Sequence, residues 1–219
     1  MQNTPSPAQD RPPLLPTFIL SSLQRLNRHL LGLLAFPECH RLLHVPPGLA
    51  QRFAQLSEER REALALVPYA LFDLRFADES GWQQAMLAAA HPRVADAPVA
   101  ESPLQHLAQL VVFFAWNLVQ VERRCAPLVL GMSERLVDAL AAVTLDRLPG
   151  LTTLLHQGLT LRWAASRSYW GLLTSEACRP GSTDFHRAQL FGLQLEAAAL
   201  VASLNGGARG RKGAGMPVR

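Results

Sequence analysis

The sequence predicts an all-α protein built from two tandem helical modules that are related by an internal duplication. The first observation is that apolar residues recur at helical spacing, as at Leu23, Leu26 and Leu30, in the segments between prolines. The second is self-similarity. Shifted by 87 positions, the chain lies over itself without a gap for most of each half. The aligned pairs share their apolar phase and include Leu23 with Leu110, Leu64 with Leu151, Arg60 with Arg147, and Arg75 with Arg162.

The first module is expected to consist of short helices separated by prolines. A helix from Leu20 to Ala35 is ended by Pro37, a short helix follows around Cys39 to His44, and Gly48 to Leu56 forms another. Ser57 is a suitable cap for the next helix, which Pro68 ends. The remaining elements are an extended segment at 71–76, where apolar residues alternate, and a helix at 82–90.

The second module is expected to repeat this order. It opens with a long helix from Leu104 to Arg124 and a short one from Ala126 to Leu130, which Gly131 closes. Ser133 caps a helix at 134–143, and Thr144 or Asp146 caps another that runs to His156 before Gly158. The remaining predicted elements are an extended segment at 159–163 and helices at 169–177 and 185–204.

Proline and glycine content sets the domain boundaries. We expect a disordered Pro-rich leader at 1–16, a first module at 17–91, a linker at 92–103, a second module at 104–204 and a basic Gly-rich tail at 205–219. The 219 residues contain 49% hydrophobic and only 17% charged residues. So little polar cover predicts an apolar face that is buried against a partner.

The positive charge is confined to the tail. Arg209, Arg211, Lys212 and Arg219 have no acidic residue among them and account for the whole net charge of +4. If all four residues bound phosphates, a plot of log DNA affinity against log salt concentration would have a slope of about −3.6. Such a slope is typical of ordinary non-specific binding. The alternative is a solvated tail without a ligand.

The cysteines and the N-terminus favour a reducing cytoplasm. Cys39, Cys125 and Cys178 are far apart and form no CxxC pair, so neither a disulfide framework nor a structural zinc site is indicated. No signal-peptide pattern is present. The most apolar stretch, 107–121, is too short to span a bilayer and contains polar residues, so we expect a buried helix and no membrane contact.

No enzyme motif is present. The sequence has no GxGxxG, GxxxxGK[ST], HExxH or GxSxG pattern, and its seven histidines are scattered. We therefore expect no enzymatic activity, no catalytic residues, no metal site and no cofactor.

Residues 133–156 are predicted to form a helix, a tight turn and a second helix. This layout presents a recognition helix to the major groove of DNA in helix-turn-helix proteins. On this interpretation Arg147 and Arg162 contact DNA, with Arg60 and Arg75 as their counterparts. The alternative is an antiparallel packed hairpin whose arginines pair with nearby acids. Taken alone, the residues favour the packed hairpin.

The stretch LVLGMSERLVDALAAVTLDRLPGL at 128–151 resembles the centre of FlhD, a subunit of the bacterial flagellar activator FlhDC. Upstream, FAWNLVQ at 114–120 resembles the first long helix of that family. Downstream, the resemblance continues through Leu161-Arg162-Trp163, 169–174 and 186–200. It covers residues 104–204, and more faintly 18–90.

The resemblance implies an all-helical, cytoplasmic transcriptional activator subunit of the kind also found on integrative and conjugative elements. It would act at promoter DNA in complex with an FlhC-like zinc-binding partner. The resemblance also allows the two proteins to form a higher-order hetero-oligomer. The family implies DNA and partner contacts in the loop before the last helix and at the start of that helix, which correspond to Arg179 and His186. The alternative function is a helical adaptor or assembly factor, for example of a secretion system, that does not bind DNA.

Overall fold

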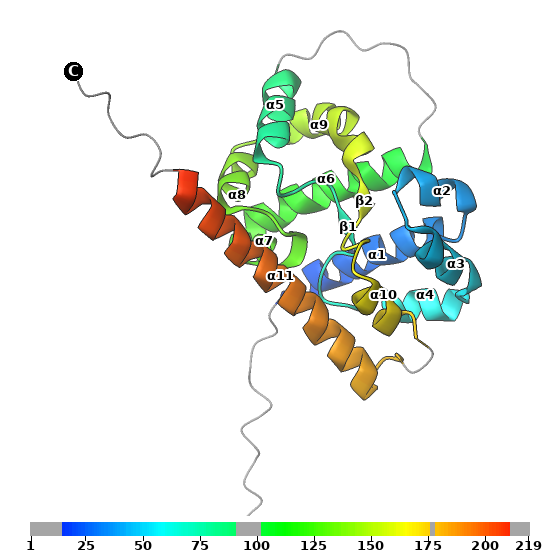
Figure 1. The fold of residues 1–219 in the computed structure, drawn as a ribbon. Coiled ribbons are helices and arrows are strands. Elements are labelled where there is room, and N and C mark those ends of the chain that lie inside the picture. Colours follow the sequence, from blue (N-terminus) through cyan, green and yellow to red (C-terminus); the bar gives the residue numbers. More distant parts are fainter. Residues whose placement is uncertain (1–14, 91–101, 176–177, 211–219) are drawn as a thin grey trace, which may run out of the picture.

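The computed structural model describes residues 15–90, 102–175 and 178–210 (Figure 1). This part of the chain is mostly helical and has only two strands, each of two residues, which confirms the all-α class. Most of the expected leader at 1–16 and of the linker at 92–103 lies outside the described residues, as does the tail from 211 onward. The first part of the expected tail, 205–210, continues the last helix, which was expected to end at 204.

The first series of elements contains five helices and a strand. Ser57 caps α4 as predicted, because the backbone N–H of Arg60 donates to its Oγ at 3.2 Å. The cap of α5 was not predicted: Asp78 Oδ1 accepts from the backbone N–H of Gly81 at 3.0 Å. The elements are α1 (Thr17–Leu33), α2 (Pro37–Leu42), α3 (Pro47–Gln55), α4 (Glu58–Leu64), β1 (Phe72–Asp73) and α5 (Glu79–Ala89).

The second series has the same order and is followed by one long helix. Ser133 caps α8, and Gly131 ends α7 with a φ of 76°, both as predicted. Thr144 makes no side-chain cap, because a 3-10 turn at Leu145–Arg147 precedes α9. The elements are α6 (Pro103–Val121), α7 (Ala126–Leu130), α8 (Glu134–Ala141), α9 (Leu148–Leu155), β2 (Thr160–Leu161), α10 (Arg167–Leu173) and α11 (Thr183–Gly210), with further 3-10 turns at Arg123–Cys125 and His156–Gly158.

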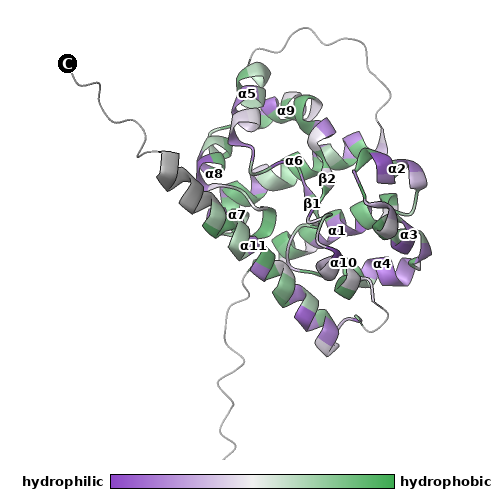
Figure 2. Ribbon diagram, in the orientation of Figure 1, coloured by the Kyte–Doolittle hydropathy of each residue, from purple (hydrophilic) through white to green (hydrophobic). Residues whose placement is uncertain are grey.

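The two series share one hydrophobic core. α6 runs through the middle of the molecule and packs along α1 (Figure 1). Its residues are mostly hydrophobic, as the colours in Figure 2 show, and Leu107, Val111 and Leu118 are fully buried. α6 is long and apolar enough to cross a membrane by length and composition alone, but these buried positions are typical of a core helix.

The two series meet at a short antiparallel ladder. Asp73 of β1 lies opposite Thr160 of β2, and Phe72 lies opposite Leu161. The backbone N–H of Arg162 extends the ladder by donating to Leu71 O at 2.9 Å. The predicted extended segments at 71–76 and 159–163 are thus confirmed in part, and they pair with each other.

The last helix of each series packs against the other series. α5 contacts α8 and α9 of the second series. Conversely, Trp170 of α10 packs edge-on against Phe53 of α3, with ring centroids 5.3 Å apart. The predicted boundaries at 17–91 and 104–204 therefore divide the sequence, whereas the core is continuous across them.

Trp82 and Trp170 hold the turns after the two strands, at a spacing of 88 residues rather than the 87 of the sequence alignment. Trp82 Nε1 donates to Leu74 O, and Trp170 Nε1 donates to Arg162 O, each at 3.1 Å and across eight residues. The residue after each acceptor, Arg75 and Trp163, has a positive φ, of 52° and 51°. Such a conformation is unfavourable for non-glycine residues, so the packed tryptophans maintain it.

A histidine pair joins α1 to α6 and leads to a prediction about pH. The rings of His29 and His106 are 5.7 Å apart. Burial, and then the neighbouring His106, lower the pKa of His29. The unfolded chain therefore binds protons more readily, and the free energy of unfolding should decrease as the pH falls below about 6.5.

We expect the effect to stay below about 1 kcal/mol because His29 is only partly buried. Urea denaturation at pH 5 to 8 measures it. His29→Gln should reduce the pH dependence, whereas the exposed His186→Gln should leave it unchanged. An unaltered profile for His29→Gln would contradict this explanation.

Candidate functional site

The residues predicted to contact DNA do not form one surface. Arg147 is exposed in the 3-10 turn before α9, and Arg179 is exposed in the loop before α11, at the opposite end of the molecule (Figure 1). His186 is exposed near the start of α11. Arg209 belongs to the last turn of α11, while Arg211 and Lys212 lie outside the described residues.

The structure contradicts the predicted role of Arg162 as a DNA contact. Its side chain is 6% exposed and forms an ion pair with Glu196 of α11, which is 3% exposed. Its Nη1 donates to Val129 O at 2.8 Å, and its guanidinium carbon lies 4.7 Å from the ring centre of Trp163. The guanidinium thus joins β2, α7 and α11 inside the protein and is not accessible to a phosphate.

α8 and α9 do not pack along each other as a hairpin, because each of them packs against α5 and α6. α9 contacts α5 and α6, so little of its surface is open to a DNA groove. Its exposed residues are Pro149, Thr153 and Leu154. None of these supplies the paired donors or charges with which a recognition helix reads bases. Within α9, therefore, the exposed surface does not have the character of a recognition helix.

The first-series counterparts of the arginines have other surroundings. Arg60 of α4 donates from Nη1 to Cys178 O at 2.5 Å and from Nη2 to Ser175 O. Arg52 of α3 donates to Thr174 Oγ1 at 3.4 Å. Both arginines hold the C-terminal end of α10, where a helix favours positive charge. Of the two counterparts, Arg60 is partly buried and Arg75 is exposed, whereas Arg52, which has no arginine counterpart, is exposed as well.

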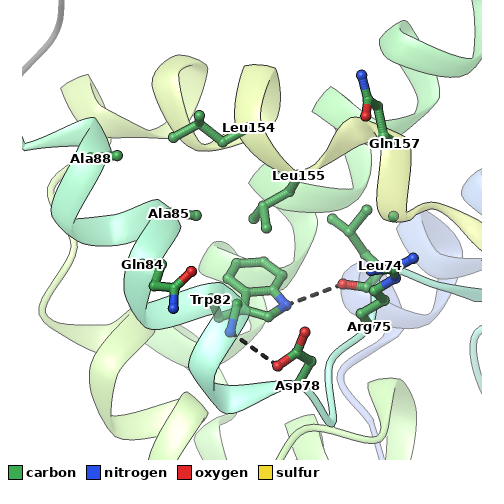
Figure 3. Close-up of a pocket in the computed structure, with 12 residues that line it drawn as sticks. Leu74, Arg75, Asp78, Trp82, Gln84, Ala85, Ala88, Leu154, Leu155 and Gln157 are labelled. Carbon is green, nitrogen blue, oxygen red and sulfur yellow. Dashed lines mark hydrogen bonds between the residues drawn. The ribbon is translucent and has the colours of Figure 1, made fainter.

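Arg75 stands at the rim of a recess between α5 and α9 (Figure 3). The recess has a volume of about 470 Å³. The indole N–H of Trp82 already donates to Leu74 O. The Asp78 carboxylate accepts from Gly81 N–H and Ser80 Oγ, and these hydrogen bonds lower its pKa. These polar groups serve the helix cap and the turn, so they do not form an acid–base pair.

A second recess, on α1 and α6, is mainly apolar. It has a volume of about 480 Å³, and Arg25 stands at its edge. Trp116 Nε1 in its lining donates to Val143 O at 2.7 Å. Phe18 of α1 is 52% exposed. We name this recess the α1–α6 groove, and its lining residues are Ser22, Arg25, Leu26, Leu110, Phe113, Phe114, Trp116 and Asn117.

Buried titratable side chains beneath α11 have partners within the fold. Tyr169 OH donates to Tyr69 OH at 3.2 Å, and Tyr69 OH donates to Ala188 O at 3.1 Å. Burial raises the pKa of both phenols, so they stay neutral near pH 7.

Burial also raises the pKa of the three cysteine thiols, Cys39, Cys125 and Cys178. Among the described residues, no three His, Cys, Asp or Glu side chains cluster as metal ligands.

Several structurally important residues were not singled out from the sequence. Asn27 is fully buried and ties α1 to the loop between α4 and β1, donating to Tyr69 O and accepting from Leu71 N–H, each at 2.9 Å. The sequence does contain a signal for the role of Glu196, because Glu196 is the one charged residue between Arg187 and Arg209. An isolated acid in so apolar a helix indicates a buried ion pair.

Comparison with protein family models, curated proteins and solved structures found no match to this chain.

Proposed function

We propose that the chain is a fused duplicate, with each series of elements descended from one ancestral copy. The repeated element order, the two tryptophan-held turns and the pairing of β1 with β2 support this proposal. A twofold pairing explains why α5 and α10 are exchanged, since identical partners commonly swap an identical element.

The function that we propose is that of an FlhD-like transcriptional activator subunit. The observation that supports it is the packing of α5 and α10 across the ladder, because the resemblance implies a subunit that pairs with itself, and two such subunits fused in one chain would contact each other through their two halves. The protein would act in the cytoplasm, without a catalytic role or cofactor, in complex with an FlhC-like zinc-binding subunit at promoter DNA.

The accessible basic residues define where DNA would bind in this proposal. Arg147 and Arg179 are exposed, so they remain candidates, together with Arg209, Arg211 and Lys212 near the C-terminal end. Because Arg147 and Arg179 lie at opposite ends of the molecule, a complex that uses both would need DNA to extend along the molecule or a partner to complete the surface. His186 remains a candidate partner contact beside Arg179.

A helical adaptor without DNA binding is the second candidate function. The α1–α6 groove favours it, because an apolar groove with one cation at its edge suits a protein helix better than a phosphate backbone. The absence of lysine and arginine from α9 favours it as well.

Co-expression with FlhC-like zinc proteins tests the activator function. We expect the two proteins to copurify and the complex to shift promoter DNA. Arg147→Ala with Arg179→Ala should weaken DNA binding and reduce the magnitude of the salt slope by up to about 1.8, whereas Arg41→Ala in α2 should leave it unchanged. Removal of residues 205–219 should lower non-specific binding and leave promoter preference intact.

A well-folded chain that binds neither FlhC-like proteins nor promoter DNA would contradict the activator function. Copurification without any DNA binding by the complex would support the adaptor instead.

A further inference from the structure

The recess between α5 and α9 corresponds in the fold to the surface on which α11 packs. Around the ladder the two series match at a spacing of 88 residues. β1 begins at Phe72 and β2 at Thr160, and Asp78 and Ser166 are the residues before α5 and α10. At this spacing, three residues that line the recess match residues that contact α11. The matched pairs are Leu74 with Arg162, Gly81 with Tyr169, and Gln157 with Tyr69.

The three matched residues of the other series form the surface under α11. We name Tyr69, Arg162 and Tyr169 the α11 seat. Its contacts with α11 are the ion pair of Arg162 with Glu196, the ring of Tyr169 at 6.1 Å from that of Phe191, and Tyr69 against Gly192 and Ala188. The recess is therefore the counterpart of a surface that holds a helix elsewhere in the same fold.

Arg75 brings a guanidinium to the recess at the place that Arg162 fills in the α11 seat. Arg162 Nη1 lies 3.4 Å from Ala70 O. Gly158 matches Ala70 at the spacing of 88, and a Cβ on Gly158 would lie 3.4 Å from Cδ and 3.6 Å from Nε of Arg75. The two arginines thus lie beside matching residues, although they are one position apart in the register. Arg162 is buried against Glu196, whereas Arg75 is exposed and forms no ion pair with a described residue.

The recess has room for larger side chains than the α11 seat accepts. Where the seat has the rings of Tyr69 and Tyr169, the recess has Gln157 and Gly81, and a volume of about 470 Å³ is open beside them. The wall opposite Gln157 is apolar and includes Leu154, which is 50% exposed (Figure 3). To fill this space to the density of a protein interior, a helix must present bulky apolar side chains where α11 presents alanine and glycine.

We propose that the recess binds a helix of a partner protein, and that this helix carries bulky apolar residues at two positions four apart and a carboxylate one turn later. The spacing is that of Ala188, Gly192 and Glu196, which are buried on the face of α11 toward its seat. The carboxylate pairs with Arg75, as Glu196 pairs with Arg162. The proposal rests on the match between the two surfaces and not on the proposed function.

The charges at the recess select an acidic helix. Asp78 also lines the recess, but its carboxylate already accepts from Gly81 N–H and Ser80 Oγ. The guanidinium of Arg75 is therefore the charge that can pair with a ligand, and a charge-assisted hydrogen bond to a carboxylate suits it.

This chain does not supply the helix itself. Among its described helices, only Glu196 is an acid with helical residues four and eight positions before it, and that face of α11 is covered by its own seat. The occupant is therefore a different protein.

Fluorescence anisotropy of a labelled synthetic peptide, titrated with the full chain, tests the proposal. The peptide has the sequence of residues 183–202 with Ala188→Leu and Gly192→Leu, and it keeps Glu196. It cannot enter the α11 seat, because a Cβ at position 192 collides with Tyr69. We expect saturable binding. The same peptide with Glu196→Gln should bind about fivefold more weakly.

Variants of the protein locate the peptide. Arg75→Ala should weaken binding about fivefold and make the protein insensitive to Glu196→Gln in the peptide, because the two groups pair. Ala88→Trp, at an exposed residue of the recess wall, should abolish binding. The matched controls are Arg25→Ala at the α1–α6 groove and Ala54→Trp at an exposed position of α3, and both should bind as the parent chain does.

Circular dichroism verifies that each variant is folded. Absence of saturable binding, or equal binding by Ala88→Trp and the parent chain, would overturn the proposal. Sedimentation velocity of the parent chain gives a further check. A dimer that Ala88→Trp abolishes would assign the recess to a second copy and overturn the partner helix.

Discussion

Glu196→Ala is expected to lower the free energy of unfolding by about 3–5 kcal/mol, because it leaves the buried Arg162 guanidinium without its counter-charge. Burial, only partly offset by Arg162, raises the pKa of Glu196, and burial lowers the pKa of Arg162. Each charge is therefore held at a cost in desolvation, and each relies on the other. Urea denaturation followed by circular dichroism measures the loss.

The double variant Arg162→Met with Glu196→Leu distinguishes an unpaired charge from a lost contact. Removing both charges should restore most of the stability, since apolar residues of similar volume often replace a buried ion pair without loss. Val129 O keeps the backbone N–H of Ala70 as a donor at 3.0 Å in this variant. A double variant less stable than Glu196→Ala would contradict this explanation.

Gly192→Ala is expected to be the second most damaging substitution, at about 3 kcal/mol. A Cβ at this position would lie 2.2 Å from Cζ and from the hydroxyl oxygen of Tyr69. Tyr69 is fully buried and hydrogen-bonded to Tyr169 and Ala188, so its ring cannot move aside without breaking those contacts. The substitution should push α11 away from the body, and urea denaturation again measures the loss.

Gly32→Ala in α1 is the matched control, because nothing lies within 4 Å of a Cβ there. It should stabilise the protein by up to about 1 kcal/mol through helix propensity alone. Comparable losses at both glycines would show that the contact with Tyr69 is not the cause.

Local signals in the sequence predicted the elements well. Ser57 and Ser133 cap the helices assigned to them, Gly131 ends α7, and both extended segments form the ladder. Each of these features depends on a few neighbouring residues. Helix ends without such a signal were less accurate: α10 ends at Leu173 rather than Ala177, and α6 ends at Val121 rather than Arg124.

The exchange of helices and the burial of Arg162 were not predicted, because they depend on residues far apart in the chain. Arg162 meets Glu196 across 34 residues and Val129 across 33. The alignment by 87 positions paired Arg162 with Arg75, but the two turns correspond at a spacing of 88: Arg75 and Trp163 both have a positive φ, and Trp82 and Trp170 donate to Leu74 O and Arg162 O. In the structure the position that corresponds to Arg162 is therefore Leu74, so the gap-free alignment paired the wrong residues here.

The packing of α5 against α8 and α9, and of α10 against α3, has a consequence for how the protein responds to dilution. In a dimer of separate subunits, swapped helices are released when the subunits dissociate at low concentration. Here one polypeptide contains both series of elements. Because they are covalently linked, each series meets the other at a high effective concentration that does not depend on the protein concentration. The scaffold therefore remains assembled even in a cell that contains only a few molecules of it.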